Sequence, residues 1–241
     1  MKIEKFNSLE STNKYCEALD LAEVEDFTCY WALEQTAGIG QRGNHWESAP
    51  GKNLTFSLVL HPTFLPAERQ FKLTEALSLA LVDFLSPLTF LLSPSIKWPN
   101  DIYIATNKIC GTLVSAHYTT SHLSSAVCGI GLNVNQTIFH NWVPNPTSLS
   151  LLTGMEFELE PLLKKLLTCI EKRYNDLKSG LDPEPEYLSH LLNLNIPARF
   201  LYNEEELTAT ITGIDPHGRL LLTTSDGRHL CCGMKEISFI L

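Results

Sequence analysis

The feature that most constrains the fold is a long uncharged interval in the middle of the chain. Residues 109–155 contain no Asp, Glu, Lys or Arg. Two segments within this interval, ICGTLVSAHY (109–118) and SSAVCGIGLNV (124–134), predict two strands joined by a polar turn over residues 119–125. Strands without charge along their whole length are typical of the centre of a sheet, where both faces are buried. We therefore expect these two strands to pair inside a sheet.

The segments on either side predict an α+β chain in two parts. Helices are expected over residues 8–21 (with Ser11 or Thr12 as the N-cap), 66–85, 161–177 and, as a short piece, 187–192. Further strands are expected over residues 27–33, 53–60, 96–98 and 101–105. We expect a first domain over residues 1–190, with a mixed or antiparallel sheet flanked by helices. The five short strand patterns within residues 196–241 predict a small barrel as a second domain over residues 191–241.

Charge and hydropathy exclude several classes of protein. The chain has 241 residues, 44% of them hydrophobic, and a formal net charge of −9, which argues against a general nucleic-acid binder. The apolar stretch 84–96 contains two prolines and is too short for a membrane span, which needs about 20 apolar residues. No apolar run follows the N-terminal lysines, so we expect a cytoplasmic protein without membrane contact. The seven cysteines form no CxxC pair and the eight histidines form no HExxH or HxH motif, so we expect no metal site built by the protein.

A glycine-rich loop carries the first chemical signal. The letters GIGQRG at residues 38–43 match the GxGxxG fingerprint, but that motif opens a helix, and here Pro50 and Gly51 are followed by a strand pattern. A Walker loop fails as well, because no Ser or Thr follows Lys52. The loop is better interpreted as a set of backbone N–H groups that bind an anion, with Arg42 for phosphate and Trp46 for the face of a base. The alternatives are a flexible hairpin tip and, for Trp46, an anchor in the core.

A second cluster begins at KWPND (97–101). The proline restricts the preceding residue to extended geometry and turns the chain, which places Asn100 and Asp101 at the start of a strand. Lys108 then enters the uncharged sheet, where a lysine is costly to bury unless it faces an anion; we predict a ligand carboxylate or phosphate. Asn133 ends the second uncharged strand, where it can bond a ligand or cap a turn. For KWPND, the alternative is an ordinary Pro-Asn-Asp turn with Lys97 on the surface. For Lys108, the alternative is a position at an exposed strand end.

Taken in order, these segments resemble the biotin–protein ligase family. STN (11–13) resembles the early S-T-N of the family, and EQTAGIGQRGNHWESAPGKNL (34–54) resembles its GRGRRGRxWxSPxGxNL loop. KWPNDIY (97–103), KICGTLVS (108–115) and GIGLNVN (129–135) resemble KWPNDly, KiaGiLvE and GiGiNvN. The match is colinear across nearly the whole chain, and the C-terminal strands resemble the SH3-like end domain of the family. The resemblance implies a class II synthetase-like catalytic domain, in the form without the DNA-binding domain that some relatives carry.

The resemblance also implies an ATP-dependent reaction in two steps. Biotin and ATP, with Mg²⁺, would give biotinyl-5'-AMP, and a specific lysine of a biotin carboxyl carrier protein would then take the biotinyl group. Carried over by position, the residues around biotin and its activated carboxyl would be Ser11, Thr12, Asn13, Gln35, Gly38, Gly40, Gln41, Arg42, Lys108 and Gly111. Those around the nucleotide would be Trp46, Lys97, Asn100 and Asn133. Arg42 and Lys108 would supply positive charge where two anions meet, and Asp101 would orient or deprotonate the acceptor lysine.

Departures from the family pattern and rival families set further expectations. Ile39, Gln41 and Asn44 stand where the glycine loop of the family often carries Arg, so we expect a weaker hold on the adenylate. Only ten residues precede Ser11, so we expect no DNA-reading helix and no operator binding. The family includes monomers and dimers, and both states stay open.

Three alternative functions compete with this interpretation. The related lipoate ligases share the fold and the acyl-adenylate chemistry, but their RRxSGGGxVxHD-type loop is absent here. A non-catalytic biotin or nucleotide-binding module would lack the cations, yet Arg42 and Lys108 are present. An oxidoreductase with a dinucleotide-binding fold would need a helix after Gly43.

Overall fold

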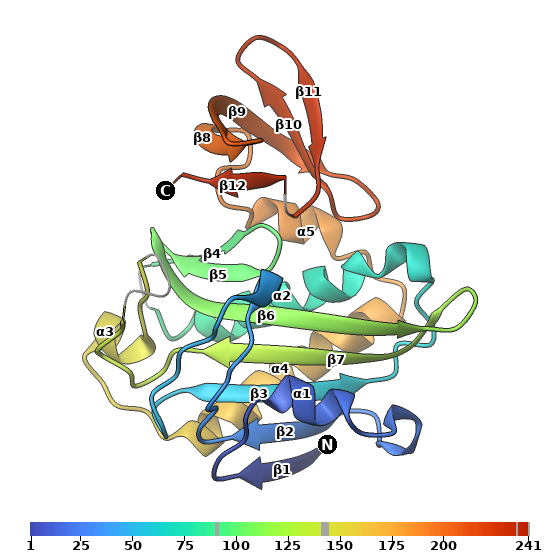
Figure 1. Cartoon of the computed structure of the whole chain (residues 1–241), viewed down its shortest axis with the longest axis vertical. Coiled ribbons are helices and arrows are strands. Elements are labelled where there is room, and N and C mark those ends of the chain that lie inside the picture. The colour runs from blue at the N-terminus through green and yellow to red at the C-terminus, as the bar shows by residue number, and fades with distance from the viewer. Residues whose placement is uncertain (90–91, 141–144, 235, 241) are drawn as a thin grey trace.

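The computed structural model describes residues 1–89, 92–140, 145–234 and 236–240, and for Arg42 it describes the backbone but not the side chain. The chain forms two sheets, a larger one below and a smaller C-terminal one above it (Figure 1). The larger sheet contains β1 (Lys2–Phe6), β2 (Thr28–Ala32), β3 (Leu54–Leu60), β4 (Pro94–Lys97), β5 (Asp101–Ile104), β6 (Asn107–Tyr118) and β7 (Leu123–Leu132). Their order is β1-β2-β3-β7-β6-β5-β4.

The uncharged interval forms the centre of this sheet, which confirms the prediction from the sequence. Strand β7 lies between β3 and β6, and both pairings are antiparallel. The parallel pairing is that of β1 with β2, so the sheet is mixed, as expected. In the register of β6 and β7, Gly111 lies opposite Gly131, so neither strand carries a side chain at this position.

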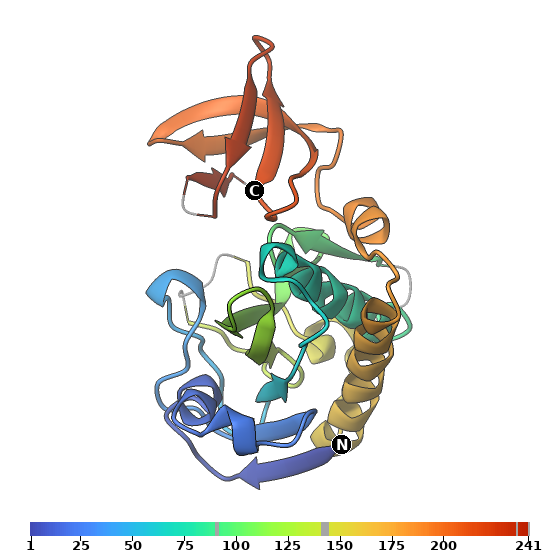
Figure 2. The same ribbon diagram turned by 90° about the vertical axis from the view of Figure 1, so that its right-hand side faces the viewer.

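Helices cover both faces of the larger sheet unequally. Helices α2 (Phe71–Leu85) and α4 (Leu159–Lys178) pack against one face, and the short α1 (Thr12–Glu17) lies on the other (Figure 2). The apolar residues of α2 and α4 are buried in the main core, so the side chains of the opposite face are free to build a site. Within the described part of the chain, no helix has the length and apolar character that crossing a membrane requires.

Several local predictions were incomplete. The helix expected over residues 66–85 begins at Phe71, after a 3-10 helix, η3 (Ala67–Arg69), and the short helix expected over residues 187–192 lies at Glu184–Ser189 instead. The helix expected over residues 8–21 is shorter, because Ser11 caps α1 as predicted but the chain turns after Ala18 into a 3-10 helix, η1 (Leu21–Glu23), which Asp20 caps. The sequence pattern missed β1, a half-exposed edge strand with three charged residues. It also missed α3 (Leu149–Thr153), which begins after Ser148 and ends at a left-handed Gly154.

The C-terminal strands form an open sheet rather than the expected barrel. Helix α5 (Glu184–Ser189) leads into β8 (Pro197–Tyr202), β9 (Glu205–Ile214), β10 (Leu220–Thr224), β11 (His229–Cys232) and β12 (Ile237–Phe239). All pairings among them are antiparallel, in the order β11-β10-β9-β8-β12. Closure would need β11 to pair with β12, and among the described residues it does not. The five strands were predicted correctly, and their closure was wrong.

The smaller sheet docks on the turn between β4 and β5. The indole Nε1 of Trp98 donates a hydrogen bond to the carbonyl oxygen of Gly218 at 2.9 Å. Gly218 has a φ of +79° and its Cα faces the ring of Phe71, where an added Cβ would lie 2.2 Å from ring carbons. The contact between the two sheets therefore requires glycine at this turn.

Candidate active site

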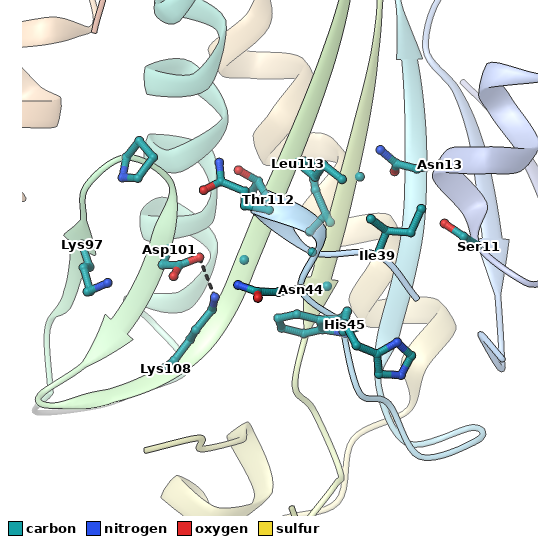
Figure 3. A pocket seen from close by; sticks show the side chains of 18 of the residues that line it. Ser11, Asn13, Ile39, Asn44, His45, Lys97, Asp101, Lys108, Thr112 and Leu113 are labelled. Atoms are coloured by element: carbon teal, nitrogen blue, oxygen red, sulfur yellow. Dashed lines mark ion pairs between the residues drawn. The ribbon is translucent and has the colours of Figure 1, made fainter. Parts of the chain in front are cut away.

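A cavity of about 280 Å³ opens on the face of the larger sheet that α1 covers. It lies between α1, the glycine loop 38–46, the strands β6 and β7, the turn 98–100 and the C-terminal strand β12. Figure 3 shows Lys97, Asp101 and Lys108 on one side of the cavity, and Ser11 and Asn13 on the other. The cavity thus has one end with charged groups and one end with neutral polar groups.

The floor of the cavity is built from glycines on two neighbouring strands. A Cβ added to Gly129 would lie 2.0 Å from Oδ1 of Asn13, and one added to Gly131 would lie 2.3 Å from Cε2 of Trp46. Real Cβ atoms do not approach so closely, so both glycines are required for these two side chains to reach the sheet. At Gly111, opposite Gly131, an added Cβ would lie 3.1 Å from Oδ1 of Asp101 and 3.3 Å from Nζ of Lys108, a tight contact that a small shift of these side chains would relieve.

The neutral end is a connected set of hydrogen bonds. The backbone N–H and the Oγ1 hydroxyl of Thr12 both donate to Oε1 of Gln35, at 2.7 Å and 3.1 Å. Below them, the hydroxyl of Ser57 on β3 lies 2.8 Å from the Thr12 hydroxyl and 2.5 Å from Oδ1 of Asn13. Asn13 is buried, and its Nδ2 has no hydrogen-bond partner among the described residues. A buried amide that lines a cavity in this state is suited to bind a polar atom of a ligand.

The charged end combines two lysines and one carboxylate. The Nζ of Lys108 lies 2.7 Å from Oδ1 of Asp101 and 5.7 Å from the ring centre of Trp46. The Nζ of Lys97 lies 5.0 Å from the ring centre of Phe239 on β12. Asp101 is the only carboxylate among the described residues that line the cavity. The lysines therefore outnumber the carboxylate, and this end is suited to an anionic ligand.

Tyr103 of β5 also lines the charged end. Burial, together with the nearby charge of Asp101, raises the pKa of its phenol, so the hydroxyl stays protonated.

Within the described ranges of the chain, no cluster of three or more His, Cys, Asp or Glu side chains could hold a metal ion.

The glycine loop closes on itself over the cavity. Its two sides join through a bridge between Ile39 and His45, a bond from Gly40 N to Asn44 O at 2.7 Å, and one from Trp46 N to Gly38 O at 2.9 Å. A single 3-10 turn, η2 (Gln41–Gly43), forms the tip, and the next regular element is the strand β3. A dinucleotide-binding helix is therefore excluded, as the sequence indicated.

Most of the residues predicted for the site lie together in the cavity. Those that line it are Ser11, Thr12, Asn13, Gln35, Gly40, Gln41, Trp46, Lys97, Asp101, Lys108 and Gly111. Gly38 does not line the cavity and lies at the base of the loop. Arg42 was also predicted for the site, but its side chain lies outside the part of the chain that the structure describes.

The two predicted asparagines occupy different places. Asn133 lines a small adjoining cavity that it shares with Trp46 and Lys108; its Nδ2 donates to Thr147 O at 3.0 Å, and its buried Oδ1 has no partner among the described residues. Asn100 does not line either cavity, because its Nδ2 donates to the backbone oxygen of Thr112. Asn100 therefore holds β5 and β6 together at the edge of the site.

Sequence reasoning missed one wall of the cavity. Ile237, Ser238 and Phe239 of β12 line it, although they lie more than a hundred residues from the nearest predicted residue of the site. No motif marks them, because their position follows from the docking of the smaller sheet. The sequence analysis also missed Leu113 and Tyr103. Leu113 lies two residues after Gly111 and Tyr103 lies two residues after Asp101, so each pair shares one face of its strand, and this spacing could have identified them.

The comparisons with known proteins agree with this arrangement. Residues 6–133 match the Biotin/lipoate A/B protein ligase family, and residues 194–238 match the Biotin protein ligase C terminal domain. The chain is 31% identical over 226 residues to the bifunctional ligase/repressor BirA of Bacillus subtilis, covering 91% of this chain and 68% of that protein. It is 29% identical over 231 residues to the biotin–[acetyl-CoA-carboxylase] ligase of Paracoccus denitrificans, covering 92% and 94%.

A solved structure extends the similarity to the whole fold. The biotin protein ligase of Aquifex aeolicus, in complex with biotin and ATP, superposes with a TM-score of 0.81 and 26% identity over 99% of each chain. The family match covers more than half of this chain, and the matched segment contains the glycine loop and the strands that build the cavity floor. The chain belongs to the Biotin/lipoate A/B protein ligase family.

Proposed function

We propose that this chain is an ATP-dependent biotin–protein ligase, which forms biotinyl-5'-AMP and transfers the biotinyl group to a lysine of the carrier domain of a biotin-dependent carboxylase. The observation that carries the proposal is the cavity itself. It joins a neutral polar end to a two-lysine end beneath a glycine loop, in a fold whose Aquifex aeolicus relative binds biotin and ATP. A heterocycle with a carboxylate tail fits this division of polar and charged groups.

In the first step, a carboxylate oxygen of biotin attacks the α-phosphorus of ATP, and pyrophosphate leaves. Two anions must approach each other, so the barrier falls when positive groups lie beside both. Lys108 is placed for this role, and it must exchange its contact with Asp101 for the incoming carboxylate or phosphate. Lys97 stands on the nucleotide side, next to β12. Mg²⁺ would arrive on the phosphates of ATP, because Asp101 is the only carboxylate among the described residues of the cavity lining.

In the second step, a lysine amine attacks the acyl carbon of the adenylate, the acyl–oxygen bond to AMP breaks, and the amine loses a proton. A lysine amine has a reference pKa of about 10.4, so it is mostly protonated at neutral pH. Asp101 lies at the charged end and is free to accept a hydrogen bond or the proton once Lys108 has turned to the adenylate. The glycine loop above the cavity would keep water from the mixed anhydride.

The individual contacts are proposed from position. We assign the neutral end to the biotin ring system, where Gln35 and the unpartnered Nδ2 of Asn13 offer donors. We assign the charged end of the main cavity, beside Trp46 and Lys97, to the nucleotide, with Asn133 at its border. Asn100 has a buried Oδ1 without a partner among the described residues, as Asn133 has, but it lines neither cavity, so we assign it to the support of the turn through its bond to Thr112.

The partner and the domain division are also proposals. The Paracoccus denitrificans relative is named for acetyl-CoA carboxylase, which supports a carboxylase carrier as the acceptor. The two sheets support a division of the chain near residues 190 and 191. A cytoplasmic location stays a prediction from the sequence.

The complete reaction tests the proposal. The purified chain is incubated with MgATP, biotin and the isolated carrier domain of an acetyl-CoA carboxylase, and the product is measured by intact mass and peptide mapping. We expect one biotinyl group on one lysine, and none on a carrier whose acceptor lysine is changed to arginine. A parallel reaction with lipoate separates the two ligase types. Modification with lipoate and not with biotin would overturn the proposal.

A further inference from the structure

The charged end of the cavity depends on a turn that carries two of its residues. Strand β4 ends at Lys97 and β5 begins at Asp101, and these two residues are paired in the register of the hairpin. The turn between them, residues 98–100, is buried. Its position therefore sets where the carboxylate of Asp101 lies relative to Lys108, which belongs to the next strand.

Three groups from separate parts of the chain hold this turn. Trp98 donates to Gly218 of the smaller sheet at 2.9 Å, and Asn100 donates to the backbone oxygen of Thr112 on β6. The third bond comes from outside both sheets. The hydroxyl of Tyr187, on α5, donates to the backbone oxygen of Pro99 at 2.8 Å.

The hydroxyl of Tyr187 reaches Pro99 from within the core. Its side chain is fully buried, and its ring meets the ring of Phe71 edge to face, with centres 5.9 Å apart. Burial and the nearby charge of Glu75 raise the pKa of its phenol well above the usual value, so the hydroxyl stays protonated and remains a donor. Tyr187 does not line the cavity. Any effect on the reaction must therefore pass through Pro99.

We propose that Tyr187 is a positioning residue for the reaction: by anchoring Pro99, it fixes the Asp101 carboxylate at the charged end, where it pairs with Lys108 at rest and faces the acceptor amine once Lys108 has turned to the adenylate. Without the hydroxyl, the buried oxygen of Pro99 loses its donor from α5, and the turn can relax toward other partners. A shift of about 1 Å in a group near the chemistry can lower a rate about 100-fold. The inference rests on the proposed function for its kinetic test, and on the structure alone for its geometric test.

The variant Tyr187→Phe removes the hydroxyl and keeps the ring against Phe71. Tyr174→Phe is a matched control, because Tyr174 is also a buried tyrosine of the core, and its hydroxyl has no hydrogen-bond partner within the described residues. We expect Tyr187→Phe to lower the rate of biotinyl transfer to the carrier domain about 10- to 100-fold, with biotin affinity unchanged within about threefold. Tyr174→Phe should change neither.

A double substitution distinguishes positioning from general weakening of the fold. If Tyr187 acts through Asp101, adding Tyr187→Phe to Asp101→Asn should lower the residual rate by no more than about threefold. The same fold-loss in both backgrounds, or full activity of Tyr187→Phe alone, would overturn the inference.

A crystal structure supplies the readout that does not depend on activity. In Tyr187→Phe, the separation of Lys108 Nζ and Asp101 Oδ1 should exceed the 2.7 Å of the unmodified protein by about 1 Å. An unchanged separation would also overturn the inference. A wild-type chain that transfers no biotin would refute the proposed function, and the crystallographic comparison would still decide the role of Tyr187.

Discussion

Replacing Gly131 by alanine should separate the activity of this protein from its stability. Gly131 lies in the extended strand β7, so alanine fits its backbone, but the added Cβ would lie 2.3 Å from Cε2, 2.6 Å from Cζ2 and 2.7 Å from Nε1 of Trp46. Carbon atoms in contact lie about 3.5–4.0 Å apart. The indole must therefore withdraw from the cavity floor by more than about 1 Å.

The two expected effects have different sizes. A displacement of about 1 Å in a group that contacts the substrate costs about 100-fold in rate, so we expect the turnover of Gly131→Ala to fall by one to two orders of magnitude. The free energy of unfolding should change by less than about 1 kcal/mol, since Trp46 is half-buried on a loop and alanine restricts the unfolded chain. Urea denaturation and the rate of carrier biotinylation measure the two effects side by side.

Gly233→Ala is the matched control for Gly131→Ala. At Gly233 the nearest atom to an added Cβ lies 3.6 Å away, an ordinary contact, so activity should be retained. Full activity of Gly131→Ala would refute the reasoning about the cavity floor. So would a loss of stability large enough to account for the lost activity.

Three further predictions concern charge. Lys108→Ala should lower turnover by about 100-fold or more, since it removes the lysine paired with Asp101; unchanged steady-state rates would exclude Lys108 from the mechanism. Burial raises the pKa of Glu75 to about 7, against 4.5 for a free side chain, so its contribution to stability is complete below about pH 4.5 and is lost as the pH rises through 7. Urea melts of the wild type and Glu75→Gln from pH 4.5 to 8 should show the wild type losing up to about 3 kcal/mol relative to the variant, and parallel curves would contradict this. The glycine loop, which lacks arginine at positions 39, 41 and 44, should release more biotinyl-AMP to solution than an arginine-rich relative, and equal amounts trapped in a quenched reaction would disprove it.

The sequence predicted the elements whose signals are local. The uncharged interval 109–155 indicated central strands because charged groups are excluded from a sheet buried on both faces, and β6 and β7 do lie there. The glycine loop, Asp101 and Lys108 were predicted to lie near one another, since motifs of a known family place them in order, and one cavity joins them.

The rest of the site depends on contacts between distant parts of the chain. Phe239 reaches the cavity because Trp98 and Gly218 dock the smaller sheet, and neither residue carries a sequence signal for that contact. Asn100 has the same motif position as in the family, but its bond to Thr112 emerges only when β5 and β6 pair. The prediction of a closed barrel was wrong for a similar reason. Sequence patterns indicate where strands form, but they do not indicate whether the two edge strands of a sheet, here β11 and β12, pair with each other.

The central claim is that the cavity brings the carboxylate of biotin to the α-phosphate of ATP. Isotope exchange between labelled pyrophosphate and ATP reports on this step alone, without any carrier. With the purified chain and Mg²⁺, we predict label in ATP that depends on biotin and disappears in Lys108→Ala. Exchange that is absent with biotin, or equal without it, would contradict the account.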